Sequence, residues 1–406
     1  MKVTINEGLK LIEKKVKKGG FEIVSLEESL NRICAQDLKA KFNLPRFDNS
    51  AMDGYAIKLN DAGKKVKVVD TILAGEDKDI TLKESQAIKI MTGAKIPKEC
   101  EAVVPFEDIE IQDDFIILPK NIKKYANVRM AGEDVKKDEE IINDGEKIDP
   151  YKIALLASQG YSYIKVYTKP KVAIFATGKE LKMHHESIKE HQIYNSNAPM
   201  LYTRVKELGC EANLIETSDD DKESIKNIIK NLLKFDLIIT SGGVSVGEAD
   251  FTKKAFLELG AKIVFDKVDI KPGKPTTFAT FDNTYVLNLP GNPLAAAINF
   301  EIFGRFIINI LSGKKEIYQN YIDAILKEDI KNRPKREVAI PGFFDRKYFI
   351  PSKKRGPGMV TPLSKANGYI VLYRDVESLK EGSRVKFIPI KFEFTAKEKK
   401  DFFTYC

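Results

Sequence analysis

The segment from Phe235 to Phe251, FDLIITSGGVSVGEADF, constrains the fold and the chemistry of this chain more than any other. It opens with a short apolar run bounded by glycine, which is typical of a buried strand in a parallel sheet. A glycine-bearing loop follows, and such a loop exposes backbone N–H groups at a helix N-terminus, which suits an anion. Glu248 and Asp250 would repel that anion unless a cation lies between them. The segment therefore predicts a phosphate-and-metal site.

Strand and helix patterns alternate on both sides of this segment. Apolar runs such as KVAIFA, EANLI and AKIVF are separated by helical stretches such as PMLYTRVKELG and KESIKNIIKNLLKF. This alternation indicates an open, mostly parallel α/β sheet, which we assign to residues 171–315. A PGNP turn and a long apolar helix with Pro293 near its start close the unit.

Helical patterns dominate the two stretches that flank an N-terminal β region. We expect residues 1–45 and 149–170 to form a helical subdomain. Its predicted helices cover Asn6–Lys18, a stretch around Ser25–Asn31, and residues 151–160, where Gly160 suits the position after the helix end.

Short β runs separated by Gly, Asp and Asn turns fill two other parts of the chain. Residues 46–148 are expected to form an N-terminal β subdomain, and residues 316–406 a small C-terminal domain resembling a β-barrel. The fold class is therefore multidomain, with a central α/β domain and β domains on either side.

Composition excludes several classes of protein. A chain of 406 residues with 43% hydrophobic and 31% charged residues fits a soluble protein of several domains. We expect no membrane span and no signal peptide. The four cysteines lie far apart without a CxxC pair, which fits a reduced cytoplasm. The net charge of +8 is spread among acidic residues, so a nucleic-acid partner is not expected.

Ligands of an open parallel sheet bind outside the carboxyl ends of its strands, and four predicted loops occupy that position. Lys271 and Lys274 lie in KPGKP, where two prolines hold them in a suitable place for a phosphate. The glycines that would allow close backbone approach are Gly242, Gly243 and Gly291. The hard oxygen ligands for Mg²⁺ are Glu180, Asp236 and Asp250. Because Asp236 begins its strand, a capping or solvated role stays open for it.

Each of these features has an ordinary structural explanation when it is taken alone. Their occurrence at four strand ends favours a functional site. Neither G-x-x-x-x-G-K-[ST] nor G-x-G-x-x-G occurs, so the usual P-loop and dinucleotide-binding interpretations lack their fingerprint.

A second group of polar loops lies in the N-terminal half. It comprises DNSAMDGY at 48–55, IMTGA at 90–94 and RMAGED at 129–134. For any one of them taken alone, an unrelated β turn is the better explanation. The histidines of MHHESIKEH, His184, His185 and His191, suit a solvated loop better than a metal site, and none is placed for a hydrolase triad.

Seven motifs in order resemble the MoeA family of molybdopterin molybdenumtransferases, which is related to the catalytic domain of gephyrin. They are FDNSAMDGYA, IMTGA, AGEDV, ATGKEL, TSGGVSVGEADF, KPGKPTTFA and LPGNP. The resemblance implies insertion of molybdenum from molybdate into adenylylated molybdopterin, with release of AMP and assistance from Mg²⁺. It also implies an elongated cytoplasmic homodimer, supplied by an upstream molybdopterin adenylyltransferase, whose site lies between the α/β domain of one subunit and the β subdomain of the other.

The resemblance assigns roles by motif. Catalytic groups would be Asp53, Thr92, Asp134, Lys271 and Lys274. The pterin and nucleotide pocket would be shaped by Gly242, Gly243, Ser245, Pro290, Gly291 and Asn292, and metal or ligand would be held by Glu180, Asp236 and Asp250.

Three other functions are weighed against this transferase. A molybdopterin adenylyltransferase needs only the α/β unit, so the N-terminal β region argues against it. A non-catalytic scaffold of the same fold would call for an extra domain or a long linker, and a basic nucleic-acid binder for clustered charge. The preference for molybdate or tungstate stays open, because both oxyanions share shape and charge.

Overall fold

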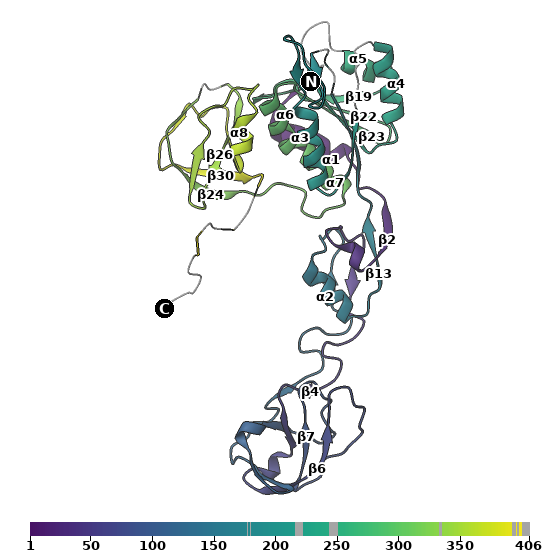
Figure 1. The fold of residues 1–406 in the computed structure, drawn as a ribbon, viewed down its shortest axis with the longest axis vertical. Helices are drawn as coiled ribbons and strands as arrows, with labels where there is room; N and C mark the ends of the chain where they lie inside the picture. The colour runs from purple at the N-terminus through teal and green to yellow at the C-terminus, as the bar shows by residue number, and fades with distance from the viewer. Residues whose placement is uncertain are drawn as a thin grey trace.

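The structure, a computed structural model, describes the whole chain except residues 177, 179, 216–221, 243–250, 333–334, 392–394, 396–397 and 400–406. It is elongated, with a globular head, a narrow arm and a small β unit at the far end of the arm (Figure 1).

The head is built on a six-stranded sheet. Its strand order is β17 (Glu211–Ile215), β14 (Lys171–Ala176), β18 (Leu237–Ser241), β23 (Thr284–Leu289), β22 (Thr277–Phe281) and β19 (Lys262–Phe265). The first four strands are parallel and β22 runs antiparallel to both of its neighbours. The mostly parallel α/β sheet predicted from the alternating pattern is therefore confirmed.

Helices cover both faces of this sheet because its strands are apolar on both sides. In β14, Val172 and Ile174 face one core and Ala173 and Phe175 face the other. The first core is covered by α1 (Ile5–Lys15), α3 (Asn197–Glu207), α6 (Pro293–Asn299) and α7 (Arg305–Leu311). The second is covered by α4 (Lys222–Leu232) and α5 (Phe251–Glu258).

The helix α1 belongs to the head and not to a separate helical subdomain. Thr4 and Glu7 form a capping box at its start, and Ile12 and Val16 are buried in the core shared with α7. The sequence analysis placed this helix in one subdomain with residues 149–170. An amphipathic pattern shows which face of a helix is buried, but it does not show which part of the protein that face packs against.

The arm consists of a two-stranded ribbon and one helix. Strand β2 (Phe21–Ser25) pairs antiparallel with β13 (Tyr163–Tyr167), and α2 (Pro150–Ser158) packs beside them. The expected helix 151–160 is confirmed, with Asp149 capping its start and Gly160 at a φ of +66° after its end. The expected helix around Ser25–Asn31 is wrong, because pairing with β13 takes Ser25 into a strand and leaves only the 3₁₀ turn η1 (Glu27–Ser29).

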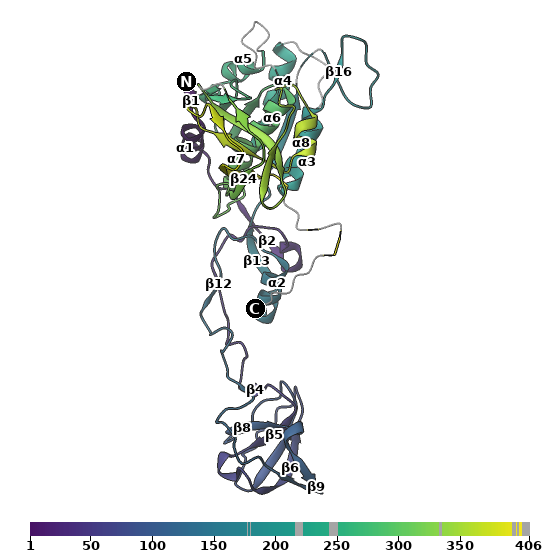
Figure 2. The ribbon, with the colours of Figure 1, turned by 90° about the vertical axis from the view of Figure 1, so that its left-hand side faces the viewer.

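The β unit at the far end of the arm contains a second six-stranded sheet. Its order is β8 (Ala102–Pro105), β5 (Gly54–Ile57), β7 (Gln86–Ile90), β6 (Lys65–Ile72), β10 (Phe115–Ile117) and β9 (Glu110–Gln112). The turns η2 (Leu59–Asp61) and η3 (Phe106–Asp108) connect parts of it. In two perpendicular views this unit lies well away from the head (Figure 1, Figure 2).

The C-terminal region is a closed five-stranded barrel, as the sequence predicted. Its order is β26 (Glu337–Phe344), β27 (Tyr348–Pro351), β24 (Ile322–Leu326), β30 (Arg384–Pro389) and β28 (Gly368–Leu372), and β28 pairs back with β26. Phe344, Phe349 and Phe387 fill the interior. The helix α8 (Thr361–Lys365) lies between β27 and β28 in the chain.

Short strands complete the fold. They are β1 (Lys2–Val3), β3 (Leu38–Lys39), β4 (Asn49–Ser50), β11 (Val128–Arg129), β12 (Glu140–Ile142), β15 (Leu181–Lys182), β16 (Ile193–Tyr194), β20 (Lys267–Val268), β21 (Ile270–Lys271), β25 (Ile330–Lys331) and β29 (Ser378–Leu379).

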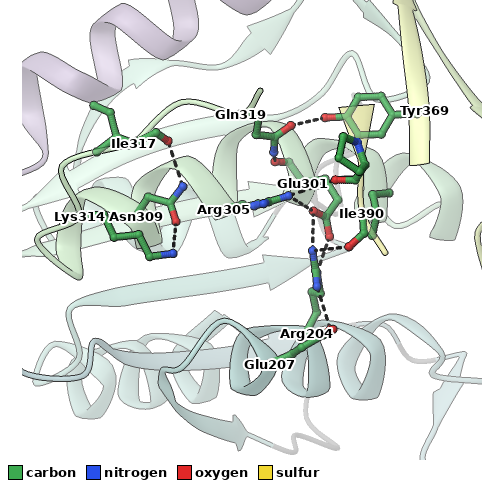
Figure 3. Close-up of polar contacts among 11 residues, drawn as sticks. Arg204, Glu207, Glu301, Arg305, Asn309, Lys314, Ile317, Gln319, Tyr369 and Ile390 are labelled. Atoms are coloured by element: carbon green, nitrogen blue, oxygen red, sulfur yellow. Dashed lines mark hydrogen bonds and ion pairs between the residues drawn. The ribbon is translucent and has the colours of Figure 1, made fainter. Parts of the chain in front are cut away.

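The barrel is held to the head by a buried polar network around the long helix. Arg204 of α3 makes two hydrogen bonds to the Glu301 carboxylate, at 2.7 and 3.1 Å, and donates a third to Ile390 O of the barrel (Figure 3). Burial opposes the positive charge, but Glu301 and Glu207 together outweigh it and hold the pKa of Arg204 above its usual value.

The long helix also corrects an expectation about membranes. No apolar stretch was expected to be long enough to cross a bilayer, but Pro293–Leu311 spans 19 residues and meets that criterion by length and composition. It runs through α6, the π-helical turn η4 (Phe300–Gly304) and α7, and 94% of its most apolar window is buried inside the protein. It is the core helix of the head.

Candidate active site

The ends of β18 and β23 form a tightly connected corner of the sheet edge. Thr240 Oγ1 donates to Asn288 Oδ1 at 2.8 Å, and Ser241 Oγ donates to Pro290 O at 3.2 Å. Gly242 follows at a φ of +94°, and a Cβ added to Gly291 would lie 3.5 Å from Gly242 Cα. The two glycine-bearing loops that the sequence placed at one crevice therefore touch.

Asn197, at the start of α3, joins these two loops. Its Nδ2 donates to Ser241 Oγ at 2.8 Å and to Gly291 O at 2.7 Å. Its Oδ1 is buried and has no hydrogen-bond partner among the residues that the structure describes. Sequence reasoning missed this residue, because an Asn at a helix start is ordinarily a cap.

The KPGKP loop is held rigidly at the same edge. Val268 N donates to Lys274 O at 2.8 Å and closes the loop. Asn299 Nδ2, from α6, donates to Pro272 O at 3.1 Å. Gly273 has a φ of +114°, and a Cβ there would lie 1.7 Å from Asn299 Nδ2. Lys271 and Lys274 are both exposed, so a fixed backbone presents two ammonium groups to solvent.

A loop of the barrel lies against the PGNP turn. Leu294 N donates to Pro357 O at 3.0 Å, and a Cβ added to Gly358 would lie 3.4 Å from Asn292 Oδ1. The loop carries the run Lys353-Lys354-Arg355 just before these contacts. Three consecutive cations followed by GPG could have indicated an anion-binding loop in the sequence, but nothing in the sequence showed which domain this loop contacts.

A pocket of about 340 Å³ opens beside this turn, between α3, α6 and α8. This volume lies at the lower end of the range of small-molecule sites. Its apolar walls include Met200, Leu294, Ala297, Met359, Val360 and Leu363. Its polar lining includes Asn197, Thr203 and Ser364, and the charged side chains of Arg204, Glu207, Glu301 and Lys391 also reach it.

The predicted metal ligands are not brought together. Glu180 is exposed at the carboxyl end of β14, where it was expected. Asp236 precedes β18 and therefore lies at the opposite edge, where its Oδ2 accepts a hydrogen bond from Lys171 N at 2.7 Å. A strand of five residues separates the two edges by about 16 Å, so Asp236 cannot share an ion with Glu180. Asp250, Gly243 and Ser245 lie outside the described residues.

Glu180 alone is compatible with Mg²⁺, because this ion typically takes one or two carboxylates and completes its shell with water and substrate phosphates. Within the described part of the chain, no three His, Cys, Asp or Glu side chains gather as a metal site. This includes the His184–His191 connection, where the rings of His184 and His185 contact edge to face at 5.5 Å.

The second group of polar loops gathers at one end of the β unit. Gly93 N donates to Ser50 O at 2.8 Å, and β11 pairs with β4. Ala131 N donates to Asp48 Oδ1 at 2.7 Å, and Asp134 N to Leu44 O at 3.0 Å. The three turns are therefore one structure and not unrelated. Asp48, which fixes the 129–134 loop, lies in the DNSAMDGY motif, but the sequence assigned it no role of its own.

Asp53 and Thr92 form a direct pair in this group. Thr92 donates from its backbone N at 2.7 Å and from its Oγ1 at 2.8 Å, both to Asp53 Oδ1. The backbone hydrogen bond, followed by the hydroxyl, holds the pKa of Asp53 below its usual value. Asp53 therefore stays an ionised carboxylate and an acceptor at neutral pH.

The two halves of the candidate site are far apart within one chain. Asp53 and Thr92 belong to the β unit at the end of the arm, and the KPGKP loop belongs to the head (Figure 1, Figure 2). In this structure the two groups of residues do not meet within one chain.

Three family models match the chain in succession. They are the MoeA N-terminal region (domain I and II) over residues 3–160, a probable molybdopterin binding domain over 173–309, and the MoeA C-terminal region (domain IV) over 323–390.

Curated proteins and solved structures agree with these models. A molybdopterin molybdenumtransferase of Staphylococcus aureus is 36% identical over 382 residues, covering 90% of each chain. One of Staphylococcus epidermidis is 34% identical and covers 95% of each. A crystal structure of a molybdopterin biosynthesis MoeA protein from Pyrococcus horikoshii has a TM-score of 0.85 at 30% identity, covering 97% of this chain and all of that one.

Proposed function

The chain belongs to the MoeA family of molybdopterin molybdenumtransferases, and we propose that it inserts molybdenum from molybdate into adenylylated molybdopterin, releasing AMP. It is accordingly a transferase of molybdenum cofactor biosynthesis. The main support for molybdenum insertion as the reaction is that three elements lie at one edge of the head sheet. These are the KPGKP loop, the Gly242–Gly291 corner and the basic loop of the barrel, beside a pocket of ligand size.

The residues at this edge suit a substrate that is anionic at one end and a flat heterocycle at the other. Lys271 and Lys274 bind the pyrophosphate or molybdate oxygens, because their loop is fixed while their side chains are exposed. The backbone beside the bound substrate is contributed by Gly242, Pro290, Gly291 and Asn292. The pocket between α3, α6 and α8 receives the pterin, whose ring lies against its apolar walls while polar lining groups such as Asn197 face the N–H groups of the heterocycle.

The proposal includes Mg²⁺ held by Glu180, with Asp250 as the second candidate. The ion would supply positive charge against the oxygens of the pyrophosphate as the phosphoanhydride bond breaks. Lys271 and Lys274 act in the same sense, since they stabilise negative charge that increases on the released AMP phosphate.

The proposal also includes a homodimer whose partner subunit completes each site. Asp53, Thr92 and Asp134 would come from the β unit of the partner, because the arm carries them away from their own head. As an ionised carboxylate, Asp53 can hold a cation or accept hydrogen bonds from the substrate, but it cannot act as the general acid.

The arm offers an apolar surface that fits a second copy of the chain. Phe21, Ile23 and Tyr163 share one face of the β2–β13 ribbon and are 61, 72 and 68% exposed. The opposite face is buried in the core of the arm, and the two faces alternate along each strand. Three large apolar side chains on one exposed ribbon face are typical of an interface.

An upstream molybdopterin adenylyltransferase supplies the substrate, and neither nucleic acid nor membrane takes part. A reduced cytoplasm is consistent with Cys34, Cys100 and Cys210, all of which carry free thiols.

The experiment is incubation of the purified protein with adenylylated molybdopterin, molybdate and Mg²⁺. We expect AMP to be released only when molybdate is present. Transfer of an adenylyl group from ATP to molybdopterin, without molybdate-dependent AMP release, would replace this function with that of an adenylyltransferase.

A further inference from the structure

A buried carboxylate, Asp269, lies two residues before Lys271 and has no role in the site described above. Its side chain is 9% exposed and Oδ1 lies 2.8 Å from Lys2 Nζ. Two further cations approach it, with Arg336 Nε 4.0 Å from Oδ1 and Arg374 Nη1 4.0 Å from Oδ2. Three positive charges therefore surround one negative charge.

These three cations come from three different parts of the chain. Lys2 belongs to the N-terminal strand β1, Arg336 immediately precedes β26, and Arg374 follows β28 of the barrel. Asp269 itself lies between β20 and β21, at the entrance to the KPGKP loop. The carboxylate, which belongs to the head, is thus the common counter-ion of the N-terminal strand and the barrel.

The backbone of the same residue joins the same three parts. Asp269 N donates to Val3 O at 2.7 Å, and its O accepts from Glu337 N at 3.1 Å. Strand β1 runs parallel to β20, and β21 pairs Ile270 and Lys271 with the start of β26. The pairing of β21 with β26 therefore fixes the backbone of Lys271, and Asp269 is the residue that immediately precedes β21.

We propose that Asp269 is a positioning residue, which fixes the N-terminal strand and the barrel against the KPGKP loop so that Lys271 and Lys274 meet the oxyanion. This inference rests on the proposed function, because it names what holds the anion-binding loop of that site. It also makes the first three residues of the chain part of the site's support.

Neutralising Asp269 would change molybdate binding in opposite directions, depending on whether the residue acts through its charge or by positioning the KPGKP loop. Asp269→Asn keeps the shape of the side chain but removes one negative charge beside an anion site. Electrostatics alone would tighten molybdate binding and lower its KM. Loss of position would weaken binding, because three cations would repel each other at the junction and the loop would shift.

The test compares molybdate-dependent AMP release and calorimetric binding of molybdate alone in wild type and D269N. We expect the KM and the Kd for molybdate to rise about tenfold while kcat stays within about twofold, since misplacing a binding group by a fraction of an ångström has effects of this order. A KM that is unchanged or lower would overturn the inference. A lower kcat at unchanged KM would show a purely structural role and overturn it too.

Two further variants keep the result interpretable. Asp282→Asn changes the charge equally at an exposed turn between β22 and β23 and should leave both constants unchanged. The double variant K2M/D269N removes the ion pair without changing net charge, so charge alone predicts an unaltered KM and position predicts a raised one. It also serves if D269N fails to fold.

The outcome separates this inference from the proposed function. Wild-type protein that neither binds molybdate nor releases AMP would overturn both. Wild-type protein that does so, with D269N indistinguishable from it, would overturn the positioning role alone.

Discussion

Replacing Gly273 by Ala tests whether the shape of the KPGKP loop governs oxyanion binding. The added methyl carbon would lie 1.7 Å from Asn299 Nδ2, which is less than half a normal contact distance. Asn299 is fully buried and its Nδ2 donates to Pro272 O and Ala295 O, so it has little freedom to withdraw. The residue also has a φ of +114°, which an L side chain rarely adopts.

The magnitude follows from these contacts. Holding a non-glycine residue at such a φ costs about 1–3 kcal/mol. Displacing the Asn299 amide adds the loss of two hydrogen bonds, about 1 kcal/mol each. A total of about 3–5 kcal/mol is enough for the loop to shift instead of absorbing the strain. A displacement of about 1 Å can lower a rate by about a hundredfold.

The assay is molybdate-dependent AMP release, together with the thermal unfolding midpoint. We expect activity to fall at least about tenfold. Gly260→Ala is the matched control, because Gly260 has a φ of +103° but nothing within 4 Å of the added carbon. In Gly260→Ala, backbone strain alone should lower the unfolding midpoint, while activity stays near normal. Normal activity and an unchanged midpoint in Gly273→Ala would refute the account of this loop.

Further predictions concern individual side chains. Asp53→Ala and Lys274→Ala should each abolish molybdenum insertion while the circular dichroism spectrum and unfolding midpoint stay unchanged, because both residues are exposed on loops; near-normal cofactor formation by either would count against the assignment. Thr92→Ala removes one of two hydrogen bonds that lower the pKa of Asp53, so the acidic limb of the kcat/KM profile should move to higher pH, and an unmoved limb would separate Asp53 from catalysis. Asn197→Ala should lower the free energy of unfolding by about 2–3 kcal/mol in chemical denaturation, because it removes both donors to Ser241 and Gly291; a loss below about 0.5 kcal/mol would show that the two loops hold together without it.

The periodic parts of the chain were predictable from sequence, and the contacts between them were not. Alternating strands and helices determine the sheet of the head, and sheet topology then fixes which loops share an edge. That reasoning placed Gly242 beside Gly291, as the structure does. It failed for Asp236, whose position at the start of its strand is what places it at the wrong edge.

Long-range packing explains what the sequence missed. The helix α1 has a clear apolar face, but only the structure shows that this face packs on α7. The basic loop that ends in Pro357 reaches the head from a separate barrel. Asn197 looks like an ordinary helix cap until its two partners, far away in sequence, are seen beside it.

We propose that each site is assembled from two chains, and a mixed dimer tests this directly. Asp53→Ala and Lys274→Ala would be co-expressed with different tags, and dimers that carry both tags purified. If the halves come from different subunits, one of the two sites in each mixed dimer has both residues intact, and about half of wild-type activity should return. If the mixed dimer is as inactive as either parent, the site is not shared between subunits.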